Sequence, residues 1–134
     1  ASGRGIASAA RRELEAGVVS LMSELAEGGP ASVTAKIVAE AASRGDALAL
    51  NVLARAANYL GIGIVNLAHT LGLTKFVIGG GVSRSGEAFW IPLREAVERY
   101  EFWPGRITVE PSALGKDAAV LGAGMLALDK VFGM

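Results

Sequence analysis

Apolar residues recur at helical spacing through the first 25 residues of the chain. Ile6, Ala10 and Leu14 stand four residues apart, which puts them in one stripe along a helix. Ser2 is suited to cap the amino-terminal end of this helix, and Gly17 interrupts it. The pattern predicts a second helix directly afterwards, because four apolar residues follow the i, i+3, i+4, i+7 spacing of a helical face: Val18, Leu21, Met22 and Leu25.

The middle of the chain predicts two further helices. Thr34 can cap a helix that Gly45 ends, and Asp46 can cap a long and largely apolar one. This long helix contains Gly61 and Gly63, each of which costs about 1 kcal/mol relative to alanine in a helix interior. We therefore expect both glycines to allow another backbone to pack closely against the helix.

The first strand signal appears at residues 75–78. In the run KFVI the apolar residues do not alternate with polar ones, and the run lies between helices, which predicts an interior strand covered on both faces. A helix is predicted over residues 86–100 and a second short strand over 107–110. Asp117 can cap a last helix that carries rows of small residues. This order predicts an α/β fold with too few strands for a complete doubly wound sheet, so we expect further chain to complete it.

Composition and charge narrow the class of protein. The 134 residues are enough for about one domain with a single core, and 51% of them are apolar. The 13 basic residues balance 13 acidic ones, so the charge gives no attraction to nucleic acid. Because the sequence has no cysteine and one histidine, it carries no recognisable zinc site.

The apolar stretch 47–71 has the length of a membrane span. Polar side chains interrupt it, and these are costly in lipid, so we interpret it as a core helix. The first residues show no targeting pattern and no initiator methionine. These features predict a cytoplasmic protein and a chain that begins inside a longer one.

Three consecutive glycines, Gly79 to Gly81, follow the first strand. In open α/β sheets ligands bind beyond the carboxyl ends of strands, and a turn without Cβ atoms lets a phosphate or ribose approach backbone N–H groups. The turn therefore predicts a nucleotide-type site. It fits neither a Walker A loop, which needs a lysine where Glu87 stands, nor a dinucleotide fingerprint, which needs a glycine where Arg84 stands. A glycine-rich turn that serves only as a tight connection is the equal alternative.

Four stretches of the chain, taken together, resemble the ROK family of sugar kinases and sugar-responsive repressors. They occur in the family's order and are ASGRGIA at 1–7, GDALALNVLARAANYLGIGIVNL at 45–67, KFVIGGGVS at 75–83 and ALGKDAAVLGAGMLAL at 113–128. The resemblance implies an actin-like, ribonuclease-H-like fold of two lobes, with sugar and ATP meeting in the cleft between them. Residues 1–112 would form most of the carboxyl-terminal lobe, and 113–134 a terminal helix that returns to the amino-terminal lobe. Without that lobe, we expect the apolar side chains of this helix to be partly uncovered.

The resemblance also implies which residues line the nucleotide. Gly79, Gly80, Gly81, Val82 and Ser83 match the family's adenosine-side loop. Gly3 and Arg4 fall in a second lining stretch, where relatives often carry proline or threonine in place of the arginine. Arg4 would approach phosphate or, as the more frequent arrangement for an arginine, point into solvent.

No catalytic residue is expected in this chain. The resemblance implies that the phosphate loop and the aspartate that acts as general base belong to the amino-terminal lobe. Asp46 and Asp117 each precede a helix and are interpreted as caps, and His69 as a core or partly exposed residue. Trp90 and Trp103 are interpreted as packing residues rather than stacking partners for a base or sugar.

Three functions follow from this reading. The first is the nucleotide-side half of an ATP-dependent, glucokinase-like hexose kinase that uses magnesium and is inactive in this segment alone. The second is the ligand-binding lobe of a sugar-responsive repressor of the same family, and the third is a packing or dimerisation module without a ligand. A structural zinc site, if present in the parent protein, would lie upstream. The expected partners are nucleotide, sugar and further copies of the protein, without a membrane and without nucleic acid bound by this segment.

Overall fold

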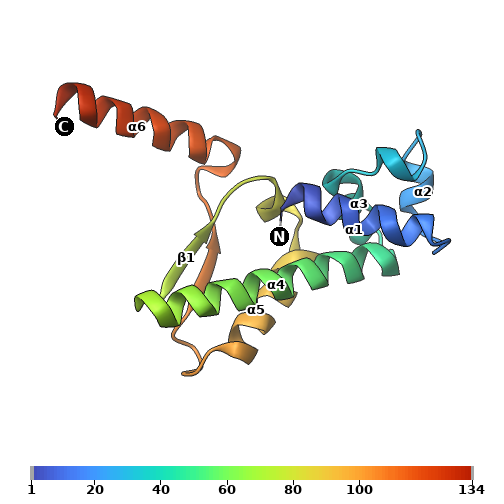
Figure 1. Cartoon of the computed structure of the whole chain (residues 1–134), viewed down its shortest axis with the longest axis horizontal. Helices are drawn as coiled ribbons and strands as arrows, with labels where there is room; N and C mark the ends of the chain where they lie inside the picture. The colour runs from blue at the N-terminus through green and yellow to red at the C-terminus, as the bar shows by residue number, and fades with distance from the viewer. Residues whose placement is uncertain (1, 134) are drawn as a thin grey trace.

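The computed structural model of the chain describes residues 2–133. Its elements are α1 (Gly3–Glu15), α2 (Met22–Leu25), η1 (Pro30–Ser32), α3 (Ala35–Ser43), α4 (Ala47–Leu71), β1 (Lys75–Ile78), η2 (Gly81–Arg84), α5 (Glu87–Tyr100), β2 (Thr108–Pro111), η3 (Gly115–Asp117) and α6 (Ala118–Phe132). Helix α4 runs along the body of the molecule, with α1, α2 and α3 grouped at one end and the two strands at the other, while α6 extends away (Figure 1).

The amino-terminal helices form the first of two hydrophobic clusters. Ser2 caps α1 by accepting from the N–H of Gly5 at 3.2 Å, and Thr34 caps α3 by accepting from the N–H of Ile37 at 3.3 Å. Both predicted caps are therefore confirmed. The cluster that these helices build with the first half of α4 includes Ile6, Ala10, Leu14, Met22, Val33, Val38 and Leu53.

The prediction of a helix over residues 18–25 is wrong for the first half of that range. Only α2 is helical, and Val19 is 95% exposed in the segment before it. The carboxylate of Asp46 accepts from the hydroxyl of Ser20 at 3.0 Å and from the N–H of Leu21 at 2.8 Å. Because this long-range anchor fixes the chain ahead of α2, the apolar spacing does not extend into one continuous helix.

Helix α4 is the core helix that the sequence predicts. Asp46 caps it by accepting from the N–H of Ala49 at 2.8 Å, and Gly72 ends it in the left-handed conformation with φ of 69°. By length and composition it is the one helix within residues 2–133 that could cross a membrane. Its buried side chains, however, belong to both hydrophobic clusters, among them Val52, Leu53, Ala57, Ile64 and Val65.

The two glycines of α4 differ in their surroundings. A methyl group placed on Gly61 would lie 2.6 Å from the Cβ of Ala96 on α5, so the predicted close packing is confirmed there. A methyl group on Gly63 would meet nothing within 4 Å. The expectation of close packing is therefore wrong for Gly63 within the described residues.

The sheet consists of two parallel strands, β1 and β2, with Lys75 opposite Thr108. Both α4 and α5 pack on one face, where Phe76 and Ile78 join the second cluster together with Ala57, Ile64, Phe89, Leu93, Val97 and Val109. The prediction that β1 is covered on both faces is wrong in this structure, since Val77 is 57% exposed. Within residues 2–133 both long neighbouring helices lie on the same side, which leaves the other face open.

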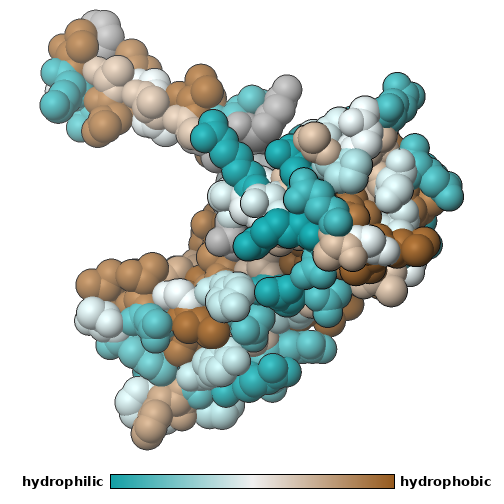
Figure 2. Space-filling view, turned by 45° about the vertical axis from the view of Figure 1, so that its right-hand side comes forward, coloured by the Kyte–Doolittle hydropathy of each residue, from teal (hydrophilic) through white to brown (hydrophobic). Residues whose placement is uncertain are grey.

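Helix α6 stands away from the body, and Figure 2 shows apolar side chains along it. As predicted, the apolar side chains are uncovered: Val120, Leu121, Met125, Leu126 and Leu128 are all exposed, with Val120 at 73%. The side chain of Asp117 makes no cap hydrogen bond, so the predicted cap is wrong at this helix. Asp117 has a helical backbone conformation, whereas a capping side chain needs the extended one that Ser2 and Thr34 adopt.

Candidate nucleotide site

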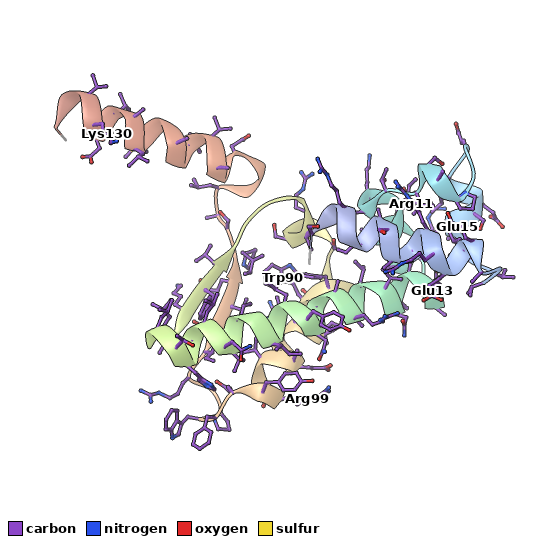
Figure 3. The ribbon with its side chains drawn as sticks, in the orientation of Figure 1. Arg11, Glu13, Glu15, Trp90, Arg99 and Lys130 are labelled. Carbon is purple, nitrogen blue, oxygen red and sulfur yellow. The ribbon has the colours of Figure 1, made fainter. Side chains whose placement is uncertain are left out.

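Hydrogen bonds hold the turn after β1 on the side that faces α5. Gly80 has φ of 84°, a left-handed conformation that side chains other than glycine rarely adopt, and it leads into the short η2 helix. The hydroxyl of Ser83 donates to the carbonyl of Gly80 at 2.7 Å, and the indole Nε1 of Trp90 donates to the carbonyl of Ser83 at 2.9 Å. Trp90, labelled in Figure 3, is only 5% exposed and belongs to the core, as predicted for it. These bonds hold the turn rigidly against α5.

The front of the same turn is open. Gly79, Gly80 and Gly81 are exposed, and a methyl group on Gly80 or Gly81 would meet nothing within 4 Å. The conformation of Gly80 requires glycine, as the tight-connection alternative expects. Gly81 has neither a positive φ nor a close neighbour, so the chain's own packing gives no reason for a glycine there.

A hollow of about 540 Å³ lies in front of the turn. It brings together residues from three segments that are distant in sequence: the start of α1, the first half of α3 and the η2 turn. Of the predicted site residues, Gly3, Gly81 and Val82 line it. Arg4 is exposed and does not line the hollow, and Ser83 is buried behind the turn. The other lining residues, which sequence analysis did not identify, are Ala35, Lys36, Ala39, Arg84 and Ser85.

The hollow has a positive electrostatic character. Lys36 and Arg84 line it, and the amino-terminal ends of α1 and α3 lie beside it. Neither helix has an acidic side chain in its first turn, so nothing there offsets the positive ends of the helix dipoles. Lys36 stands two residues after the cap Thr34, so the sequence predicts its place at the start of a helix. That α3 lies next to the glycine turn is a tertiary contact, which no sequence pattern indicates.

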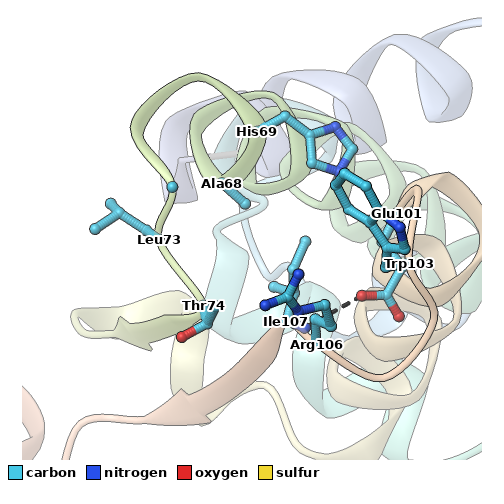
Figure 4. Close-up of a pocket in the computed structure, with 9 residues that line it drawn as sticks. Ala68, His69, Leu73, Thr74, Glu101, Trp103, Arg106 and Ile107 are labelled. Atoms are coloured by element: carbon cyan, nitrogen blue, oxygen red, sulfur yellow. Dashed lines mark hydrogen bonds between the residues drawn. The ribbon is translucent and has the colours of Figure 1, made fainter.

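A second hollow, of about 230 Å³, lies at the amino-terminal edge of the sheet (Figure 4). Its polar groups already serve the fold. The carboxylate of Glu101 accepts from the N–H groups of Gly105 at 2.5 Å and Ile107 at 3.1 Å, and Nε2 of His69 accepts from the N–H of Phe102 at 3.3 Å. His69 is thus the partly exposed, hydrogen-bonded residue that the sequence predicts. Trp103 lines this hollow at 58% exposure, so it does not pack in a core here, and a packing role at an interface, the other role predicted for it, stays a prediction.

Asp46 is arranged as a structural carboxylate rather than a catalytic one. Burial raises the pKa of Asp46, but donation from the N–H groups of Ala49 and Leu21 and from the Ser20 hydroxyl outweighs burial and leaves the pKa below its ordinary value. A carboxylate held ionised by three structural donors is a cap and tether rather than a general base. Among the side chains that the structure describes, no group of three or more histidine, cysteine or acidic residues could hold a metal ion.

The family is established by comparison with known proteins. The ROK family model matches residues 1–130. The chain is 43% identical over 96 residues to a glucokinase from Halalkalibacterium halodurans, a match that covers 70% of this chain and 29% of that protein. It is 34% identical over 132 residues to a glucokinase from Thermotoga maritima, covering 95% of this chain and 42% of that protein.

Solved structures agree with the fold. A ROK family glucokinase from Streptomyces griseus, determined in complex with glucose and AMPPNP, matches with a TM-score of 0.83 and 28% identity over 94% of this chain and 42% of that one. A ROK family transcriptional regulator matches with a TM-score of 0.70 at 20% identity, over 83% of this chain and 27% of that one, which shows the shared fold alone.

The helix-rich body with its two parallel strands is therefore part of the actin-like fold of sugar kinases. The chain belongs to the ROK family, as the four sequence stretches indicate, and it spans about 42% of the length of the Thermotoga glucokinase that it matches.

Proposed function

We propose that this chain forms the nucleotide-binding side of the cleft in an ATP-dependent hexose kinase of the glucokinase type. The observation that carries the proposal is the open hollow in front of the turn, which Gly3, Gly81 and Val82 line together. The names of the matched relatives support it, since two are glucokinases and one such protein was crystallised with glucose and a nucleotide analogue.

The proposed role of these residues is to bind and orient the nucleotide. Gly81 lets a ligand approach the backbone, and the rigid support by Trp90 and Ser83 keeps the turn from moving when it does. Phosphoryl transfer by ATP-dependent kinases also needs a group that positions the attacking hydroxyl, and a magnesium ion that neutralises charge on the phosphates. Among residues 2–133 no group of three or more histidine, cysteine or acidic side chains could hold a metal ion, and we assign magnesium no ligand on this chain. The family resemblance puts the general base and the phosphate loop in the amino-terminal lobe, so we expect the chain to be inactive by itself.

Two alternatives remain from the sequence. A repressor of the same family would share the fold but not the kinase reaction, and it would carry a helix-turn-helix that precedes this region. A packing module without a ligand would leave the hollow unused. The identity to glucokinases over up to 95% of this chain favours the kinase over the repressor.

Nuclear magnetic resonance titration with ADP and with AMPPNP tests the proposal. We expect the amide resonances of residues 79–83 to shift with nucleotide concentration in the millimolar range. The variant Gly81→Leu should abolish these shifts, because its side chain enters the hollow. It should leave the melting temperature almost unchanged, since nothing of the chain lies within 4 Å of a Cβ at this position.

A flat titration of the unaltered chain at millimolar nucleotide contradicts the proposal and favours the packing module. Shifts that survive in Gly81→Leu would contradict the assignment of the site to this hollow. The control substitution Gly63→Ala lies on α4, away from the hollow, and should leave the nucleotide shifts intact.

A further inference from the structure

Two ionisable side chains hold the turn of residues 101–107, which joins α5 to β2. Nε2 of His69, in the last turn of α4, accepts from the N–H of Phe102 at 3.3 Å. The carboxylate of Glu101 accepts from the N–H groups of Gly105 at 2.5 Å and Ile107 at 3.1 Å. His69 thus ties the start of the turn to a different element of the fold, whereas Glu101 belongs to the turn itself (Figure 4).

We propose that His69 is a proton-operated latch for the start of this turn. A ring nitrogen that accepts a hydrogen bond carries no proton, so the bond from Phe102 requires the neutral imidazole with its proton on Nδ1. Uptake of a second proton turns Nε2 into a donor, which cannot bond to the N–H of Phe102. The start of the turn is then released, while the bonds to Glu101 keep its second half in place.

The charged groups that face His69 come from the turn. Glu101 and Arg106 line the same hollow as His69. Both carboxylate oxygens of Glu101 already accept from backbone N–H groups, so pairing with a protonated His69 competes with two existing bonds. On α4 no charged residue stands between Arg55 and His69. The nearest charged residues of α5 and β1 do not line this hollow; they are Glu98, Arg99 and Lys75.

The part of the turn that the latch releases carries an exposed aromatic pair. Phe102 is 75% exposed, and its ring lies edge-to-face with that of Trp103 at a centroid distance of 4.8 Å. The guanidinium of Arg106 lies 5.8 Å from the centre of a Trp103 ring. A fixed backbone keeps the two aromatic side chains and the guanidinium in one arrangement. The latch therefore couples the arrangement of this surface to the proton concentration.

The composition of the chain isolates the effect. The chain has one histidine and no cysteine, so His69 is its one side chain of a type that ordinarily changes charge between pH 5 and 8. The inference is also independent of the proposed function. The latch lies at the amino-terminal edge of the sheet, whereas the glycine turn follows the carboxyl end of β1.

Solvent exchange of the Phe102 amide, measured by nuclear magnetic resonance on the full chain between pH 8 and 5, tests the latch. Dividing each rate by that of an unstructured peptide at the same pH leaves the protection that the structure provides, and the ring protons of His69 report its protonation. We expect the protection of Phe102 to fall about 2- to 10-fold as His69 gains its proton, which corresponds to one hydrogen bond. The protection of Ile107 should stay constant, because its acceptor is a carboxylate, which ordinarily stays ionised above pH 5.

Two substitutions of His69 separate its acceptor from its ring. His69→Gln supplies a carbonyl that can accept and does not titrate, so the Phe102 amide should be equally protected at pH 8 and pH 5. His69→Phe keeps a ring without an acceptor, so its protection should be low already at pH 8. The control Asn66→Ala changes an exposed residue of α4 that does not line the hollow, and should titrate like the unaltered chain.

Three results would overturn the latch. The first is protection of Phe102 that stays constant while the ring protons of His69 titrate. The second is equal loss at Phe102 and Ile107, which would mean that the whole turn loosens. The third is a fall of the same size in His69→Gln. Melting temperatures at pH 7 show whether each variant folds, and His69→Gln decides the matter by itself if His69→Phe does not.

Discussion

Gly61 and Gly63 stand on the same helix, but substitution by alanine should lower the stability of the fold at Gly61 and raise it at Gly63. A methyl group at position 61 meets the Cβ of Ala96 at 2.6 Å and the backbone nitrogen of Val97 at 3.3 Å, so α4 and α5 must move apart. We expect Gly61→Ala to lower the free energy of unfolding by about 1–3 kcal/mol through overpacking, despite the better helix propensity of alanine. Urea denaturation of the chain measures this change.

Gly63→Ala is the matched control, because nothing lies within 4 Å of its Cβ. Here only the helix propensity changes, and the free energy of unfolding should rise by up to about 1 kcal/mol. Equal effects of the two substitutions would contradict the close approach of α5 at Gly61.

Asp46 makes the stability of the chain sensitive to acid. Its pKa in the folded chain lies below the unfolded value of about 3.9, so its carboxylate stabilises the fold above that pH, and this contribution disappears as the pH falls through the folded-state pKa. We expect Asp46→Asn to lower the free energy of unfolding by about 1–2 kcal/mol at pH 7, because an amide cannot accept from all three donors. The difference from the unaltered chain should shrink below about pH 4.

Asp117→Asn controls for the change of charge, since the Asp117 side chain makes no cap bond. Its free energy of unfolding at pH 7 should equal that of the unaltered chain. A pH-independent deficit in Asp46→Asn would show that the carboxylate acts through its shape alone.

The exposed apolar side chains of helix α6 lead us to predict that the chain self-associates as its concentration rises. Leu121 and Met125 lie one turn apart on it and are exposed, and such apolar faces usually cover one another in water. The double variant Leu121→Lys, Met125→Lys should sediment as a monomer at concentrations where the unaltered chain associates. Asp129→Lys alters the charge of the same helix without removing apolar surface, and should still associate. An unaltered chain that stays monomeric at all concentrations would contradict this prediction.

The elements that the sequence predicts well are those with local signals. The caps Ser2, Thr34 and Asp46 mark the starts of three helices, and the glycine turn marks the end of β1. The prediction for the segment before α2 was wrong because the conformation of that segment depends on Asp46, more than twenty residues away. Long-range hydrogen bonds leave no periodic trace in the sequence.

The residues of the candidate site likewise include some that local sequence signals predict and some that they do not. The glycine turn was predicted from its place after the first strand, and Gly3 through the resemblance to a family stretch. Lys36 was missed because its position in the hollow follows from the packing of α3 beside η2. Coverage of β1 was misjudged because an apolar run indicates burial without telling which segments supply it.

At the level of the whole molecule, we predict that this chain alone does not transfer phosphate from ATP to glucose. Nucleotide binding needs the hollow, whereas the reaction also needs the general base and the phosphate loop, which the family resemblance puts in the amino-terminal lobe. A coupled assay of glucose 6-phosphate formation measures this, with an intact ROK glucokinase as the positive control. Glucose phosphorylation that persists through purification of the chain, and that Gly81→Leu removes, would come from the chain itself. Such a result would contradict the proposal that the catalytic groups lie outside this chain.

The hydrogen bond from the indole of Trp90 to the carbonyl of Ser83 gives the molecule a built-in optical probe. The chain has two tryptophans, and Trp103 is exposed at the far edge of the sheet. In a Trp103→Phe background the emission would come from Trp90 alone, whose ring nitrogen is bonded to the turn that borders the hollow. Filling the hollow should therefore alter the intensity or wavelength of that emission, so that fluorescence could report nucleotide occupancy without any added label.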